Sequence, residues 1–245
     1  MNEYTTLGKE EYLMKIGILN ADTISPDWAE KYGQYPEMFS KVFWDVNSSI
    51  KFKTYEVQND DFPQNINECD AYLVTGSKAD AYADLPWILN LKQFVRTLNN
   101  HHKKIIGICF GHQLIAEALG GKVKKSKNGW HVGVDLLKFN TEISDYGKPG
   151  EEIKLIFSHQ DEVATLPQTA KLLAGSQLCP NGMFIMNNVI CFQGHIEFSP
   201  DYARAVFSSR EELIGSVKYT NACNTLGKKT DELIVVQWIL DFLKN

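Results

Sequence analysis

The chain has 245 residues, 44% of them hydrophobic and 22% charged, and a formal net charge of −5 at pH 7. This composition is typical of a globular protein, and an acidic balance without a basic stripe excludes nucleic acid as an expected partner. No apolar run approaches the ~20 residues that span a bilayer, and residues 1–11 are polar and acidic, unlike a signal peptide. We therefore expect a cytoplasmic protein that does not bind membranes.

Five cysteines are spread along the chain without the C-x-x-C spacing of a zinc or redox motif: Cys69, Cys109, Cys179, Cys191 and Cys223. An odd number of distant cysteines predicts free thiols rather than a disulfide framework, which fits a reducing cytoplasm. Nothing in the sequence indicates a metal site or a cofactor. Most of these cysteines should be small buried hydrophobic residues, and only its neighbours single out Cys109.

Short apolar runs alternate with amphipathic segments in the first half of the chain, after a leader at 1–13 that we expect to be loosely attached. Strands are expected at 15–20, 52–57, 71–75 and 105–108, and helices from residue 25, at 35–43, at 86–98 and at 110–119. Strands separated by helices in this way favour a parallel sheet covered on both faces. In such sheets, functional sites gather beyond the carboxyl ends of the strands.

The second half of the chain predicts antiparallel strand pairs. Hairpins are expected between 123–125 and 132–139 and between 183–186 and 189–192, with strands at 153–157 and 172–174, an exposed loop at 141–152, and helices at 199–213 and 231–243. We therefore predict an α/β fold: a three-layer, flavodoxin-like, mostly parallel sheet flanked by helices, with an additional antiparallel hairpin region in the second half. Residues 1–245 are assigned to one domain, which the helical segment 205–245 closes.

The stretch from 105 to 121 has the pattern of a nucleophile elbow. A β-branched run leads into Gly107-x-Cys109-x-Gly111 and then into an apolar helix. A sharp turn that exposes one side chain leaves little room for a Cβ on its neighbours, which explains the two glycines. Cys109 would lie at a helix N-terminus, where the unpaired N–H groups and the helix dipole favour a thiolate.

A cysteine nucleophile needs a base and a group that orients the base, and His195-x-Glu197 offers both. Side chains two residues apart project from the same side of an extended chain, so the carboxylate can lie beside its imidazole. In isolation, such a pair is more often a chance surface pair. Together with the elbow at Cys109, it favours a catalytic interpretation.

Two motifs of the chain resemble those of class I glutamine amidotransferases. The segment 107–113, GICFGHQ, resembles the G-x-C-x-G-x-Q signature of that family, and 193–198, QGHIEF, is similar to its late H-P-E motif. The order of the motifs also matches, and the resemblance covers roughly residues 15–200. It implies Cys109 as the nucleophile, His195 as general base and acid, and Glu197 as the orienting carboxylate. The implied reaction is hydrolysis of a γ-glutamyl amide through a thioester, with release of ammonia or an amine.

The resemblance also implies an oxyanion hole made of backbone N–H groups. One donor would be Phe110, directly after the nucleophile, and the other would come from Gly76 and Ser77. The family usually has two glycines in that loop, so Ser77 is a departure, as is Ile196 where the family has proline. Neither departure removes a reacting group.

Gln113 and the segment 158–161, SHQD, are the expected substrate contacts. The resemblance implies that Gln113 helps to hold the substrate and that His159, Gln160 and Asp161 belong to a segment that contacts it through the main chain. From spacing alone, Gln113 is equally well explained as a packing or solvated amide. We assign His159 a structural or substrate-lining role rather than that of a rival base.

The sequence leaves the substrate open between glutamine and another small γ-glutamyl compound. It contains no pyrophosphatase or P-loop motif, so the chain either works alone or pairs with a separate synthetase subunit. It is similar to the glutaminase domain of GMP synthase, yet loop 75–82 looks more like that of free-standing members, including plant γ-glutamyl peptidases. A second class of function is a non-catalytic, redox-sensing protein on the same scaffold. The His195-x-Glu197 pair favours the hydrolase, since a sensor needs no proton shuttle.

Overall fold

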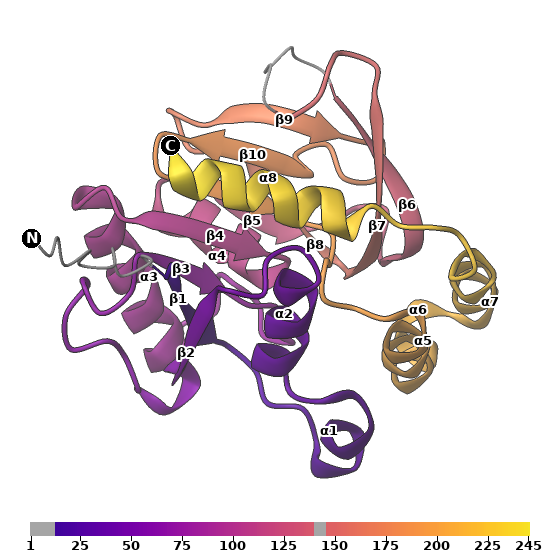
Figure 1. The fold of residues 1–245 in the computed structure, drawn as a ribbon. Coiled ribbons are helices and arrows are strands. Elements are labelled where there is room, and N and C mark those ends of the chain that lie inside the picture. The colour runs from indigo at the N-terminus through magenta and orange to yellow at the C-terminus, as the bar shows by residue number, and fades with distance from the viewer. Residues whose placement is uncertain (1–12, 140–145) are drawn as a thin grey trace, which may run out of the picture.

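The computed structural model describes residues 13–139 and 146–245 (Figure 1). Its strands are β1 (Lys15–Asn20), β2 (Lys51–Glu56), β3 (Ala71–Val74), β4 (Lys104–Ile108), β5 (Lys122–Lys125), β6 (His131–Phe139), β7 (Glu152–His159), β8 (Asp161–Thr165), β9 (Lys171–Gly175), β10 (Met183–Met186) and β11 (Val189–Phe192). Its helices are α1 (Pro26–Tyr32), α2 (Tyr35–Trp44), α3 (Pro86–Asn100), α4 (Phe110–Ala118), α5 (Pro200–Ser209), α6 (Glu211–Ile214), α7 (Ser216–Thr225) and α8 (Glu232–Lys244), and a 3-10 turn, η1 (Val57–Asn59), follows β2.

One nine-stranded mixed sheet runs through the described residues in the order β2-β1-β3-β4-β11-β10-β9-β6-β7. From β2 to β11 neighbouring strands are parallel, and from β11 to β7 they are antiparallel. Every residue of β3 and β11 is buried, as expected for parallel strands that are covered on both faces. The predicted α/β fold with an antiparallel second half is confirmed.

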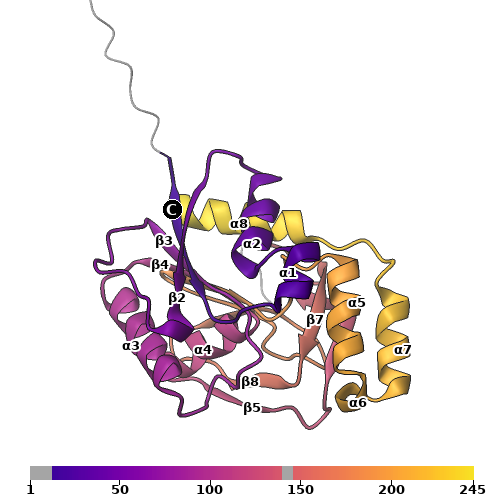
Figure 2. The ribbon, with the colours of Figure 1, turned by 90° about the horizontal axis from the view of Figure 1, so that it is seen from below.

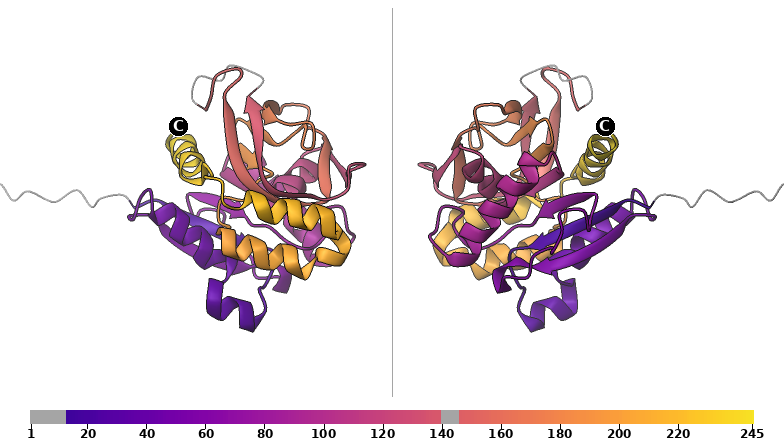
Figure 3. Two further views of the ribbon diagram at one scale, coloured as in Figure 1. Left: turned by 90° about the vertical axis from the view of Figure 1, so that its right-hand side faces the viewer. Right: turned by 90° about the vertical axis from the view of Figure 1, so that its left-hand side faces the viewer.

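Helices cover both faces of the sheet, so the fold has three layers. α3 and α4 pack on one face, and α2 and α8 pack on the other (Figure 2). Residues of β4 show the alternation directly, because Ile105 belongs to the core under α3 and α4 whereas Ile106 and Ile108 belong to the opposite core. α5 and α7 lie side by side at the β6–β7 end (Figure 3). No helix of the described segments is long and apolar enough to cross a membrane.

The predicted hairpin between 123–125 and 132–139 is wrong. β5 pairs with β8, a strand that was not predicted, in a separate two-stranded ribbon, and β6 pairs with β7 and β9. In β5 only Val123 is buried, so this polar strand has no apolar face to place in the large sheet. β6 has that face and pairs along most of its length with β7. Nearness in sequence therefore gave the wrong partner.

Three further expectations also need correction or limits. The helix predicted at 199–213 is broken at Arg210 into α5 and α6, and α7 was not predicted because its polar and β-branched sequence lacks a clear apolar period. Of the predicted exposed loop, 141–145 lies outside the described residues, whereas Tyr146 is buried and packs edge-on against Trp238. The leader lies outside the described residues except for Leu13.

Candidate active site

Cys109 lies in the tight turn between β4 and α4, at the carboxyl end of the parallel strands. Its backbone has φ 52° and ψ −104°, a strained conformation for a non-glycine residue, and such strain clusters at functional sites. Both flanking glycines are required by close contacts. A Cβ on Gly111 would overlap the carbonyl oxygen of Val74, and one on Gly107 would lie 2.7 Å from Cδ1 of Ile115. The turn therefore has the geometry expected of a nucleophile elbow.

We expect Gly111→Ala to destabilise the fold by about 3 kcal/mol, because the added methyl group meets backbone that can move only with β3. Alanine has the higher helix propensity, so a purely local effect would have the opposite sign. The measurement is chemical denaturation of both proteins. Gly227→Ala is the matched control, since a Cβ there would meet no atom within 4 Å. Equal stability of Gly111→Ala and the parent chain would contradict the tight approach to Val74.

His195 and Glu197 form a buried pair just beyond β11. Nδ1 of His195 lies 2.8 Å from Oε1 of Glu197, and the backbone N–H of Ile196 donates to the other carboxylate oxygen at 3.0 Å. The ring of Phe198 stacks on the imidazole with the ring centroids 3.7 Å apart. The backbone N–H of His195 donates to the carbonyl of Ile156 on β7 at 2.8 Å. Four contacts thus hold the imidazole and its carboxylate in one orientation.

The sheet brings this pair to the thiol. β4 and β11 are parallel neighbours, and Cys109 N–H donates to the carbonyl of Phe192 at 2.9 Å, so both segments leave the sheet at the same edge. Gly76 lies against both side chains, because a Cβ there would be 3.3 Å from Cε1 of His195 and 3.9 Å from Cβ of Cys109. Any larger side chain at position 76 would crowd the imidazole.

The electrostatics of the site favour an imidazolium. Burial by itself would lower the pKa of His195, but the carboxylate of Glu197 and the neighbouring Cys109 outweigh burial and raise the pKa to about 10. Because Nδ1 faces a carboxylate, it carries a proton. Nε2 is buried and has no hydrogen-bond partner among residues 13–139 and 146–245. The imidazole is thus held in its protonated form next to the side chain of Cys109.

The loop after β3 presents the predicted oxyanion donors. Phe110 is the first residue of α4, so its N–H has no acceptor inside the helix. The N–H groups of Gly76 and Ser77 have no acceptor in the part of the chain that the structure describes. Ser77 Oγ instead accepts from the N–H of Ala79 at 3.1 Å, which turns this side chain back onto its own loop. The role of these donors stays a prediction.

The predicted substrate contacts lie together, although some of their polar groups are occupied by the protein. Nε2 of Gln113 donates to the carbonyl of Asp161 at 3.0 Å and to Oε1 of Gln193 at 3.1 Å. His159 donates from Nδ1 to the same Asp161 carbonyl at 2.7 Å, and burial holds its pKa well below the usual range. Gln160 lines the pocket beside them. The amide nitrogen of Gln113 therefore positions the 158–161 segment.

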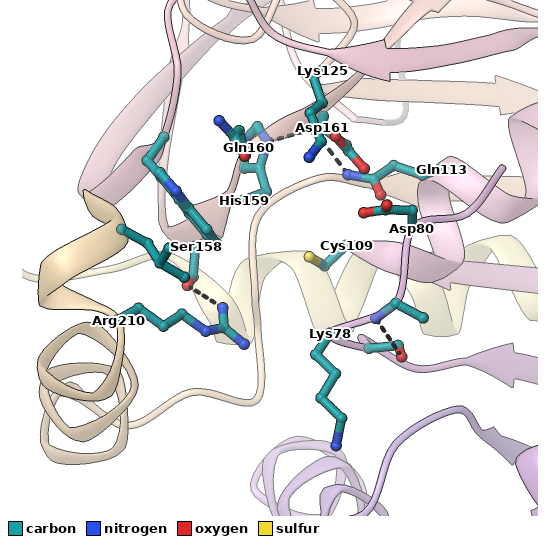
Figure 4. A pocket seen from close by; sticks show the side chains of 14 residues that line it. Lys78, Asp80, Cys109, Gln113, Lys125, Ser158, His159, Gln160, Asp161 and Arg210 are labelled. Atoms are coloured by element: carbon teal, nitrogen blue, oxygen red, sulfur yellow. Dashed lines mark hydrogen bonds between the residues drawn. The ribbon is translucent and has the colours of Figure 1, made fainter. Parts of the chain in front are cut away.

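A pocket of about 370 Å³ opens over Cys109 (Figure 4). The side chains of Asp80 and Asp161 line it, and burial, with the nearby charge of Asp80, raises the pKa of Asp161 to about 6. The hydroxyl of Tyr82 donates to Asp161 at 3.4 Å. Arg210 and Ser158 line it as well. The pocket thus carries charges of both signs around one sulfur atom.

Residues 30–210 match the family described as glutamine amidotransferase class-I. The chain belongs to this family. It is 35% identical to γ-glutamyl peptidase 4 of Arabidopsis thaliana, over 73% of this chain and 74% of that protein. It is 30% identical to a glutamine-hydrolyzing GMP synthase subunit from Archaeoglobus fulgidus, over 60% of this chain and 74% of that one. Its fold is similar to a glutamine amidotransferase of Thermotoga maritima, with a TM-score of 0.77 at 16% identity, over 96% of this chain and all of that one.

Two departures of this class I amidotransferase chain from the family motifs are accommodated locally. In the described residues, the backbone N–H of Ser77 has no acceptor, and its hydroxyl oxygen accepts from the N–H of Ala79 in the same loop. Ile196 is buried, and its N–H donates to Glu197, a bond that proline could not make. Isoleucine therefore contributes a polar contact to the carboxylate where proline would only restrict the backbone.

Two residues that line the pocket of this class I amidotransferase chain, Asp80 and Arg210, were not predicted from the sequence. Asp80 lies only four residues after Gly76 in a loop that was already assigned to the site, so its position was a usable signal. Arg210 carried no signal, because it was expected in the middle of a helix. His112 is fully buried beside the elbow, and burial lowers its pKa to about 4.

Proposed function

We propose that this chain hydrolyses γ-glutamyl amides, with Cys109 as nucleophile, His195 as general acid and base, and Glu197 as the carboxylate that orients His195. One observation carries the proposal: a buried His195–Glu197 pair, 2.8 Å between Nδ1 and Oε1, faces the strained elbow of Cys109 across Gly76. A redox sensor would not need a buried His195–Glu197 pair beside the thiol.

In the first half-reaction, the Cys109 thiolate attacks the γ-carbonyl carbon, and an electron pair moves onto the carbonyl oxygen. As this intermediate collapses, the C–N bond breaks and His195 gives its Nε2 proton to the leaving nitrogen. A γ-glutamyl thioester and a neutral imidazole remain. Water then attacks the thioester while His195 takes its proton, and the C–S bond breaks to release glutamate. The thiolate and the imidazolium are thereby restored.

The remaining site residues take supporting roles in this proposal. The N–H of Phe110 and an N–H of the Gly76–Ser77 loop stabilise the oxyanion that forms on the γ-carbonyl. Gln113 holds the 158–161 segment, whose His159, Gln160 and Asp161 border the substrate. Serine can stand at position 77 in place of the usual glycine, because only the backbone N–H of that residue takes part in the reaction.

We further propose that the chain acts without a synthetase subunit. The two relatives differ on whether a synthetase is involved. One is named γ-glutamyl peptidase 4, and the archaeal relative is named as a subunit of GMP synthase. The peptidase is the more similar of these two and matches more of this chain. A small-molecule γ-glutamyl substrate is therefore sufficient for activity, and ammonia need not pass to a partner.

The purified chain should become labelled at Cys109 by a diazo-ketone analogue of glutamine, because the thiolate attacks the carbon that mimics the γ-carbonyl. Mass spectrometry of tryptic peptides locates the label. His195→Ala should slow labelling strongly, since the imidazolium that sustains the thiolate is lost. Ammonia release from glutamine and cleavage of γ-glutamyl dipeptides then measure turnover. Labelling elsewhere, or equal labelling after His195→Ala, would exclude the hydrolase.

A further inference from the structure

Charged side chains line the pocket on both sides of Cys109. Asp80 and Asp161 lie on the side of Gln113, where Lys125 lies beside Asp161, and Arg210 lies on the opposite side with Ser158 (Figure 4). Every γ-glutamyl compound carries an α-ammonium group, which is complementary to the two carboxyl groups. With the γ-carbonyl at the sulfur, the substituent on the amide nitrogen then extends toward Arg210.

The guanidinium of Arg210 is oriented by two neighbouring side chains and is available to bind an anion. Its Nη1 donates to the hydroxyl of Ser158 at 3.4 Å, and its guanidinium lies over the ring of Trp130, 5.6 Å from the centroid. No carboxylate lies within ion-pair distance of Arg210 in the described segments, whereas Lys78 on the same pocket pairs with Asp22 at 3.0 Å. A guanidinium backed by an aromatic ring keeps its planar fork available for a carboxylate.

The backbone at Arg210 explains its orientation. α5 ends at Ser209 and α6 begins at Glu211, and Arg210 between them has φ −120° and ψ 13°, outside the helical geometry. An unbroken helix would carry the side chain in a different direction. Leu213, which lies beyond the family match at 30–210, also lines the pocket. The Arg210 side of the pocket is therefore built partly from chain outside the matched family region.

We infer that Arg210 binds a carboxylate on the leaving amine, and that it makes the chain prefer γ-glutamyl amino acids and peptides over glutamine. The inference rests on the proposed function. Ammonia, the leaving group of glutamine, carries nothing that reaches Arg210. An amino acid or peptide leaving group carries a carboxylate, and two parallel N–H···O bonds from the guanidinium fork hold it.

The test crosses enzyme variants with matched substrates. kcat/KM is measured for γ-glutamyl-glycine, γ-glutamyl-glycinamide and glutamine with the parent chain, Arg210→Gln and Arg210→Lys. Arg210→Gln should lower kcat/KM for γ-glutamyl-glycine roughly 30-fold, which is the size expected for the loss of a charge-assisted hydrogen bond. The kcat/KM values for the other two substrates should change by less than about threefold. Arg210→Lys should recover part of the loss. Arg204→Gln, the same change at an exposed position of α5, is the control and should leave all three rates unchanged.

Each of the other possible results would overturn the inference about Arg210. An equal loss with all three substrates would overturn the inference, because Arg210 would then hold the fold or the α-carboxylate that all three share. A ratio of acid to amide substrate that Arg210→Gln does not change would overturn it as well. If the parent chain hydrolyses glutamine but shows no preference for the acid, the proposed function stands and the inference fails. If it hydrolyses none of the three, the proposed function fails and the inference falls with it.

Discussion

Cys109→Ala is expected to abolish hydrolysis of γ-glutamyl amides, and His195→Ala to lower kcat by about 10⁴-fold or more on its own. The two side chains act as one unit, since the thiolate depends on the imidazolium and the leaving nitrogen depends on its proton. The double variant should therefore be no slower than Cys109→Ala alone. Additive losses would mean that the two residues contribute independently, which the proposed mechanism does not allow.

Single-turnover kinetics with γ-glutamyl-p-nitroanilide would measure these rates, because acylation of Cys109 releases the chromophore directly. Cys223→Ala is the matched control, a free cysteine on α7 that does not line the pocket, and it should keep the parent rate. Circular dichroism of each variant establishes that the fold is retained. A His195→Ala variant that keeps more than a few per cent of the parent rate would contradict its role as acid and base.

The local part of the site was accessible from the sequence because its determinants lie a few residues apart. The turn at Cys109 depends on glycines two residues to either side, and His195 and Glu197 meet because they are two residues apart. The sequence alone could not establish how the turn at Cys109 and the His195–Glu197 pair come together. That depends on β4 and β11 being parallel neighbours, although residues 108 and 192 are far apart in the chain.

The unpredicted features share a different cause, namely competition between strands and helices for one sheet. β5 has an exposed, polar pattern and pairs with β8, since β6 is already paired with β7. At the break at Arg210 the chain changes direction, and α5 contacts both α6 and α7. Neither result is encoded in a local period of the sequence. The residue that we place at the leaving-group side of the pocket was missed for this reason.

Glu197→Gln is expected to lower kcat/KM on the order of 10³-fold while leaving the shape of the site intact. Its amide oxygen can still accept from Nδ1, but the charge that sustains the imidazolium is gone. Because Glu197 is the main cause that raises the pKa of His195, burial would then prevail and the pKa would fall. A smaller fraction of His195 would then be protonated at neutral pH, so less imidazolium would be available to protonate the leaving nitrogen.

The pH range of activity should also differ between the parent chain and Glu197→Gln. With the pKa of His195 near 10, above its ordinary 6.5, the parent should lose activity only as the pH rises toward 10, and Glu197→Gln should lose it at a lower pH. Stability should follow the same direction: the protonated pair stabilises the parent fully below about pH 6.5, and this contribution disappears as the pH rises through about 10. Glu212→Gln, on the surface of α6, controls for the lost charge. If the alkaline limbs of Glu197→Gln and the parent coincide, Glu197 does not set the protonation of His195.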